Sequence, residues 1–145
     1  MTRILTVLMT LAFLSTPVFA AGTKDKAATM YKNPGCSCCD GYAKYLRKHG
    51  FKVEVKETAE HDAISKKAGI PEDFQGCHTT FVDGYVIGGH VPMSAVNKLL
   101  NERPKVKGIS LPGMPAGSPG MGGEKDETWK IYSIGDGKPK VYVTE

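Results

Sequence analysis

Apolar and polar residues alternate or recur at helical spacing between residues 29 and 104, and this pattern predicts seven short elements. Phe51, Val53 and Val55 alternate with charged residues, as in a strand that is buried on one face. Asp83-Gly84 lies between two apolar, β-branched runs, which indicates a tight hairpin. In chain order, the predicted elements are a strand at 29–31, a helix at about 41–49, a strand at 51–56, a helix at about 60–68, two strands joined by the hairpin, and a helix from Pro92 to Pro104.

The order β-α-β-α-β-β-α is that of a thioredoxin-like domain, in which a sheet carries helices on both faces. We therefore predict an α/β protein whose thioredoxin-like domain covers residues 21–110. The composition changes after this range, because residues 111–123 are rich in Pro and Gly and carry no charge. Two alternating runs beyond them flank Gly135-Asp136-Gly137 and predict a terminal hairpin. Residues 111–145 are thus interpreted as a C-terminal extension, made of an arm and a β-hairpin.

Residues 1–20 have the pattern of a secretory signal peptide. Arg3 supplies a positive start, and the apolar run that follows has about eleven residues, too few to span a bilayer. Val18-Phe19-Ala20 ends in small residues suited to cleavage, so we expect cleavage after Ala20 and export to a bacterial periplasm. An uncleaved membrane anchor is the alternative. No other stretch approaches transmembrane length, and we expect no stable membrane insertion after cleavage.

The overall composition is that of an ordinary soluble globular protein. Of the 145 residues, 23% are charged and 41% are hydrophobic, which is enough apolar material for a core. The formal net charge of +4 is spread along the chain without a basic cluster, so nucleic acid is not an expected partner. We expect a monomer.

Four cysteines are the most informative residues of the chain. Two of them have CxxC spacing at the start of a predicted helix, where backbone N–H groups and the helix dipole favour thiolate. A third cysteine lies between them, and the fourth begins the predicted hairpin, which approaches this helix start in a thioredoxin-like fold. Thiolates suit a soft cation such as Cu(I). We therefore predict one soft-metal site built from Cys36, Cys38, Cys39 and Cys77.

Three other uses of these cysteines stay open at this stage. Two structural disulfides would suit an exported protein, although the adjacent Cys38 and Cys39 are too crowded to form two separate disulfide bonds easily. A four-cysteine zinc site usually takes two separated CxxC pairs. The third use is a thiol-disulfide oxidoreductase that acts through Cys36 and Cys39. Thioredoxin-like oxidoreductases typically place a proline just before the hairpin, whereas residues 76–79 here contain none.

The four histidines differ in their value as candidate ligands. His90 lies in a Gly-Gly-His-Val-Pro loop that can approach the site. His78 follows Cys77 directly, but alternation along a strand can turn the two side chains apart. His49 ends a predicted helix, where a cation is favourable, and is interpreted as structural. His61 lies in a polar stretch and is expected to be solvated.

Met114 and Met121 are further candidate ligands, because they lie in an arm with almost no other functional side chain. A thioether is a soft ligand that selects Cu(I) and stays uncharged at any pH. The arm is therefore interpreted as closing over the metal, and the alternative is a flexible linker with incidental methionines.

Several segments together match the pattern of one known family. They are Asn33-Pro-Gly-Cys-x-Cys-Cys-Asp-Gly41, Cys77-His-Thr79, Gly84-Tyr-Val-Ile87, Gly89-His-Val-Pro92 and Pro112-Gly-Met-Pro-x-Gly-Ser-Pro-Gly-Met121. In these segments the chain resembles the CopG-type copper-resistance proteins, which are exported and unrelated to the DNA-binding repressor of that name. The resemblance covers nearly all of the chain after the predicted cleavage site.

The resemblance implies a thioredoxin-like domain whose C-terminal extension contributes to metal binding. It also implies a multinuclear copper cluster bridged by cysteine sulfurs, and a proposed role as a copper oxidoreductase that interconverts Cu(I) and Cu(II) during detoxification. Periplasmic copper efflux or chaperone proteins are the implied protein partners. Carried over by motif, the metal ligands are Cys36, Cys38, Cys39 and Cys77, with His90, Met114 and Met121 as additional ligands and His78 as the least certain.

Overall fold

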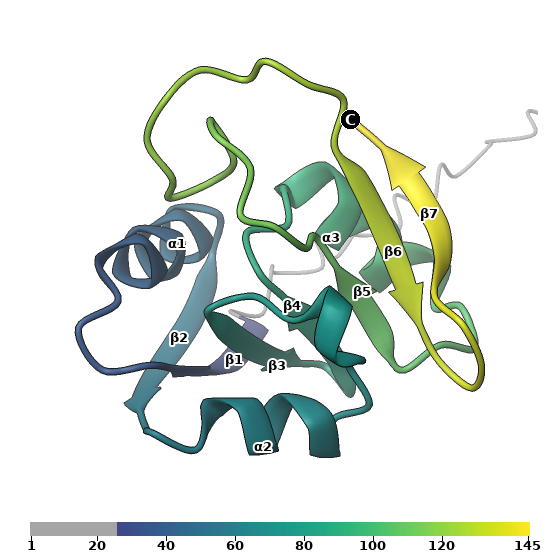
Figure 1. Ribbon diagram of the computed structural model, residues 1–145, viewed down its shortest axis with the longest axis horizontal. Helices are drawn as coiled ribbons and strands as arrows, with labels where there is room; N and C mark the ends of the chain where they lie inside the picture. Colours follow the sequence, from purple (N-terminus) through teal and green to yellow (C-terminus); the bar gives the residue numbers. More distant parts are fainter. Residues whose placement is uncertain (1–25) are drawn as a thin grey trace, which may run out of the picture.

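Residues 26–145, which the computed structural model describes, form an α/β fold around a single sheet of seven strands (Figure 1). The predicted signal peptide lies outside the described residues. Within residues 26–145, no helix is both long and apolar enough to cross a membrane. The elements are β1 (Lys26–Lys32), α1 (Ser37–Lys48), β2 (Phe51–Glu57), α2 (His61–Lys67), the 3₁₀ turn η1 (Glu72–Phe74), β3 (His78–Val82), β4 (Tyr85–Gly88), α3 (Met93–Glu102), β5 (Gly108–Ser110), β6 (Lys130–Ile134) and β7 (Lys140–Thr144).

The strand order β2-β1-β3-β4-β5-β6-β7 contains the thioredoxin-like arrangement at one end. Strand β1 pairs in parallel with β2 and antiparallel with β3, and β3 pairs antiparallel with β4. The parallel pair is connected by α1, and the antiparallel pair by a tight hairpin. This topology confirms the predicted fold class and places the start of α1 beside the start of β3.

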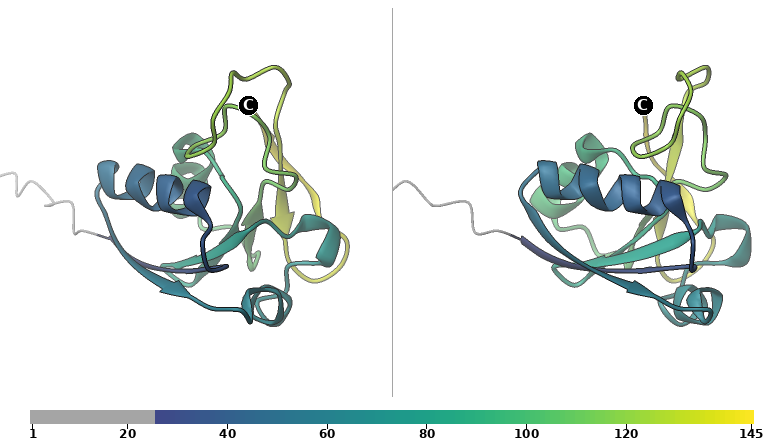
Figure 2. Two further views of the ribbon diagram at one scale, coloured as in Figure 1. Left: turned by 60° about the vertical axis from the view of Figure 1, so that its left-hand side comes forward. Right: turned by 90° about the vertical axis from the view of Figure 1, so that its left-hand side faces the viewer.

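Helices cover both faces of the sheet (Figure 2). The main core lies on the side of α1 and α3, where Tyr42 and Leu99 pack against Met30 and Ile87 of the strands. A smaller cluster on the opposite side, around Ile70, Ile134 and Val86, takes in residues next to α2 and η1. Neighbouring residues of one strand point to opposite faces, so Ile87 and Val86 of β4 serve different clusters.

Glycines and turns end the elements where the sequence indicates. Gly50 follows α1 with a φ of +86°, and Gly69 follows α2 with a φ of +88°, conformations that glycine adopts without steric cost. Asp83 and Gly84 both have positive φ values, as expected for a two-residue hairpin between β3 and β4. The terminal hairpin is also confirmed, as β6 and β7.

Strand β5 is not predicted from the sequence, because its three residues are too few to show hydrophobic alternation. It pairs in parallel with β4 and antiparallel with β6. The terminal hairpin therefore continues the main sheet. Gly108 makes this contact possible, since a Cβ atom at that position would lie 1.7 Å from the carbonyl oxygen of Val86.

His61 is buried, so the expectation that it is solvated is wrong. Its Nε2 atom lies 3.1 Å from Ser65 Oγ and 3.2 Å from Thr79 Oγ1, and the two hydroxyls are 2.6 Å apart. Because His61 and Ser65 are four residues apart in α2, they share the helix face that packs on β3. The polar composition of this stretch therefore does not indicate that one face of α2 is buried, because that face is polar and is buried with its hydrogen bonds satisfied.

Candidate metal centre

Three cysteines lie on the first turn of α1, just after the end of β1. Asn33-Pro34-Gly35 makes the turn, with Gly35 at a φ of +73°, and the amide of Cys36 donates to the carbonyl of Asn33 at 3.3 Å. Cys36 is the N-terminal cap of α1 and has extended backbone angles. Cys39 is buried, whereas Cys36 and Cys38 are half-buried. The turn therefore points three sulfurs to one place at a helix N-terminus.

Cys77 supplies the fourth sulfur from the residue immediately before β3. Its Sγ atom lies 3.2 Å from Cys39 Sγ and 3.7 Å from Cys38 Sγ. The sheet fixes this approach, because the amide of Asn33 donates to the carbonyl of Cys77 at 3.5 Å. The four sulfurs all lie within 4.8 Å of one another. The structure thus brings together the four predicted cysteines.

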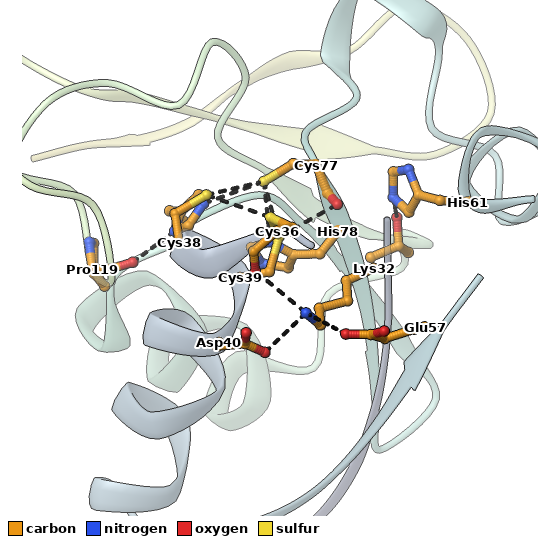
Figure 3. The surroundings of a disulfide bond; sticks show 12 residues. Lys32, Cys36, Cys38, Cys39, Asp40, Glu57, His61, Cys77, His78 and Pro119 are labelled. Atoms are coloured by element: carbon orange, nitrogen blue, oxygen red, sulfur yellow. Dashed lines mark hydrogen bonds and ion pairs between the residues drawn. A yellow bond between two sulfur atoms is a disulfide. The ribbon is translucent and has the colours of Figure 1, made fainter. Parts of the chain in front are cut away.

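The structure contains a Cys36–Cys39 disulfide, with Cys38 and Cys77 as free thiols beside it (Figure 3). Cys38 Sγ lies 3.5 Å from Cys36 Sγ. The alternative with two structural disulfides is therefore not the arrangement found. Thiolate is the form of sulfur that binds metal, so coordination by all four cysteines requires reduction of this bond.

Two buried histidines adjoin the sulfurs through Cys77. His78 Nδ1 lies 3.7 Å from Cys77 Sγ, and His90 Nε2 lies 3.5 Å from the same atom. The centroids of the two imidazole rings are 4.7 Å apart, and both rings contact the ring of Tyr42. Alternation does not separate His78 from Cys77, because Cys77 precedes the strand. Both predicted histidines therefore stand at the cluster.

Burial sets the protonation states at this site. Burial, followed by the nearby His90 and His61, lowers the pKa of His78 to about 3. Burial also lowers the pKa of His90, so both imidazoles are neutral near pH 7. The pKa of the Cys77 thiol is raised to about 12, chiefly by burial and then by Cys38. A cation that binds Cys77 must displace the thiol proton.

The donor set suits a soft or borderline transition metal. Thiolate selects Cu(I) and zinc, imidazole binds copper and zinc, and carboxylate oxygens suit Mg²⁺ and Ca²⁺. The group contains sulfur and imidazole nitrogen only. His78 Nε2 is buried without a hydrogen-bond partner, which leaves one imidazole nitrogen uncommitted. These residues fit copper.

Lys32 is a component of the site that the sequence analysis missed. Its side chain is only 2% exposed, and Nζ lies 3.0 Å from Asp40 Oδ1 and 2.8 Å from Glu57 Oε1. It also donates to the carbonyl of Cys36 at 3.4 Å (Figure 3). The hydrogen bond to Glu57 raises the pKa of Lys32 and, together with the hydrogen bond and charge of Asp40, outweighs the lowering by burial. A buried cation therefore holds the cysteine turn between β1, α1 and β2.

The arm reaches the start of α1 through its backbone. A Cβ atom on Gly41 would lie 2.8 Å from the carbonyl oxygen of Gly120, so the two backbones touch. The carbonyl oxygen of Pro119 lies 2.7 Å from His90 Nδ1. Met121 follows this contact and is half-buried, whereas 39% of Met114 is exposed. Coordination by the two thioethers stays a prediction.

The fold and the cluster define a class: a thioredoxin-like domain whose CxxC helix start carries extra sulfur and imidazole donors. A family described as "Protein of unknown function, DUF411" matches residues 74–121, from η1 through Cys77 and His90 to Met121. Two solved structures, titled "Copper resistance protein copG", Form 2 and Form 1, are each 32% identical to the chain with a TM-score of 0.77. They match 84% of this chain, and 99% and 98% of those chains respectively. No curated protein is significantly similar. The chain belongs to the CopG family of copper resistance proteins.

Proposed function

We propose that this protein binds copper in the periplasm as part of copper resistance, and that its four cysteines bridge several copper ions. The observation that carries the proposal is the convergence of the donors. Four sulfurs lie within 4.8 Å of one another, and the two buried imidazoles lie within the same distance of Cys77. The solved relatives are titled as copper resistance proteins. The predicted signal peptide supports export.

The position of Cys77 favours more than one copper ion. Its Sγ atom is close to the sulfurs of Cys38 and Cys39 and also to the imidazoles of His78 and His90. A thiolate in this position can bridge a sulfur-rich ion and an imidazole-bound ion. A single Cu(I) ion takes too few ligands to use all the donors, so the surplus supports a multinuclear cluster.

The Cys36–Cys39 pair supports interconversion of Cu(I) and Cu(II). When both residues are thiols, they can give two electrons to two Cu(II) ions. The products are two Cu(I) ions, one Cys36–Cys39 disulfide and two protons. The Cys36–Cys39 disulfide in the structure is the bond that this step would form. Cys38, Cys77 and the imidazoles stay available for copper in either state.

Copper counting on the reduced protein tests this function. The chain after cleavage at Ala20 is fully reduced, freed of reductant and titrated with Cu(I) without oxygen. Unbound metal is then removed, and copper per chain is measured by elemental analysis. We expect more than one copper per chain, and no tightly bound copper would contradict the proposal.

A thiol-disulfide oxidoreductase is the second candidate, and the disulfide at the start of α1 favours it. Cys77 occupies the position before β3 at which such enzymes typically carry a proline. Its Sγ atom also lies 3.2 Å from Cys39 Sγ, where it crowds the approach of a substrate chain. The insulin-reduction assay separates the two functions. Efficient turnover together with no copper binding would replace the copper proposal with this one.

We expect Met114→Leu combined with Met121→Leu to weaken copper retention without unfolding the domain. Leucine keeps the volume and removes the thioether, so a stability change below about 1.5 kcal/mol is expected. Release of Cu(I) to a competing chelator should become roughly tenfold easier, as for the loss of a supporting interaction. Met93→Leu, at a core position, is the matched control. Unchanged retention in the double variant would mean that the arm supplies no thioether ligand.

A further inference from the structure

We propose that Pro119 is a positioning residue for His90: its carbonyl fixes the imidazole tautomer that directs the Nε2 lone pair at Cys77. The proposal further assigns the backbone contact between Gly41 and Gly120 as the seat that holds this carbonyl in place. The copper readout of the test rests on the function proposed above. The tautomer readout does not depend on it.

The hydrogen bond at His90 determines the tautomer. The carbonyl oxygen of Pro119 can only accept, and it lies 2.7 Å from His90 Nδ1, so Nδ1 must carry the hydrogen. A neutral imidazole has one N–H group, and Nε2 therefore keeps its lone pair. This atom lies 3.5 Å from Cys77 Sγ. His90 is thus held in the form in which a histidine binds metal through Nε2.

The loop that carries Pro119 is closed by its own hydrogen bonds. The carbonyl of Pro115 accepts from both the amide and the hydroxyl of Ser118, at 3.2 and 2.7 Å. The carbonyl of Ser118 accepts from the amide of Met121 at 2.8 Å, and Gly117 donates to the carbonyl of Gly122 at 3.1 Å. Ser118 is buried. The Pro119 carbonyl is therefore presented by a defined loop, without any contribution from the thioethers.

Two glycines form the seat of this loop on α1. A Cβ atom on Gly120 would lie 2.4 Å from the amide nitrogen of Tyr42, and one on Gly41 would lie 2.8 Å from the carbonyl oxygen of Gly120. Both neighbours are backbone atoms that cannot rotate away. A side chain at either position must therefore lift the loop from the helix and move the Pro119 carbonyl away from His90.

Gly41→Ala is the sharpest test. Alanine is favoured over glycine inside a helix by about 1 kcal/mol, so α1 itself should not be weakened. Gly122→Ala is the matched control, because no atom lies within 4 Å of its Cβ position. The tautomer is read from the ring ¹⁵N resonances of His90 in the reduced, copper-free protein, and Cu(I) affinity is read by chelator competition.

We expect the wild-type protein and Gly122→Ala to show His90 with hydrogen on Nδ1. Gly41→Ala should lose that signature, and its Cu(I) affinity should fall by roughly tenfold, the usual scale for removing a partner that orients a ligand. A wild-type His90 with hydrogen on Nε2 would overturn the proposal without any variant. An unchanged His90 spectrum in folded Gly41→Ala would overturn the role of the seat. If the wild type bound no copper, the tautomer result would still decide the positioning role.

Discussion

Cys77→Ser is expected to remove most of the copper that the reduced protein binds. The Cys77 sulfur contacts both kinds of donor in the cluster, at 3.2 Å from Cys39 Sγ and 3.5 Å from His90 Nε2. A serine hydroxyl is a hard, protonated donor that cannot bridge soft cations. The Cu(I) affinity should fall by roughly 100-fold or more, beyond the usual effect of losing a supporting residue. Competition with a chromogenic Cu(I) chelator, without oxygen, measures this loss.

Ser37→Ala is the control for this variant, since Ser37 is exposed on the cysteine turn and the change leaves all four sulfurs in place. It should bind copper like the wild type. Cys38→Ser should give a smaller loss than Cys77→Ser, because Cys38 contacts two other sulfurs, whereas Cys77 contacts two sulfurs and both imidazoles. Wild-type copper loading in Cys77→Ser would show that the cluster is not organised around this sulfur.

The double substitution Asp40→Asn with Glu57→Gln is expected to destabilise the fold strongly. Both carboxylates neutralise Lys32, whose side chain is 2% exposed. Without them, a positive charge stays buried with no counter-ion, which costs roughly 3 kcal/mol in the free energy of unfolding. Urea unfolding of the copper-free protein, with the Cys36–Cys39 bond kept in one redox state, measures the change.

Lys32→Met is the complementary variant, because it removes the buried cation and keeps both carboxylates. The side chains of Asp40 and Glu57 are 52% and 56% exposed, so they remain hydrated when the lysine is removed. Methionine also fills the buried space that the lysine stem occupied. Lys32→Met should therefore destabilise the protein less than the double carboxylate substitution. The reverse order, or a double variant as stable as the wild type, would contradict a buried cation held by two surface carboxylates.

The sequence predicts the thioredoxin-like part of the fold well, because local signals and the global topology agree there. Positive φ values at Gly50 and Gly84 stand where the pattern places a helix end and a hairpin. The sequence pattern fails for the exposure of His61. A polar residue can be buried when hydrogen-bonding partners surround it, and here Ser65 of the same helix and Thr79 of a strand are those partners. Lys32 could have been found, since it continues the inward-facing positions Ala28 and Met30 of β1.

The cysteine site is predictable only in part. The first turn of α1 collects three sulfurs because of their spacing, and the expected topology then adds Cys77. The redox state of the Cys36–Cys39 pair has no signature in the sequence, because the same CxxC spacing serves a disulfide and a metal site. The contact between Gly41 and Gly120 is equally hidden, because it depends on the path of a Pro/Gly arm that has no periodicity.

X-ray absorption at the copper edge of the reduced, Cu(I)-loaded protein tests the central claim most directly. The spectrum reports the atoms bound to copper and any second copper ion nearby. The proposed cluster predicts a first shell dominated by sulfur, with a smaller imidazole contribution and a clear copper–copper distance. A first shell of nitrogen and oxygen alone, or sulfur-bound copper without a copper neighbour, would contradict a cysteine-bridged multinuclear site.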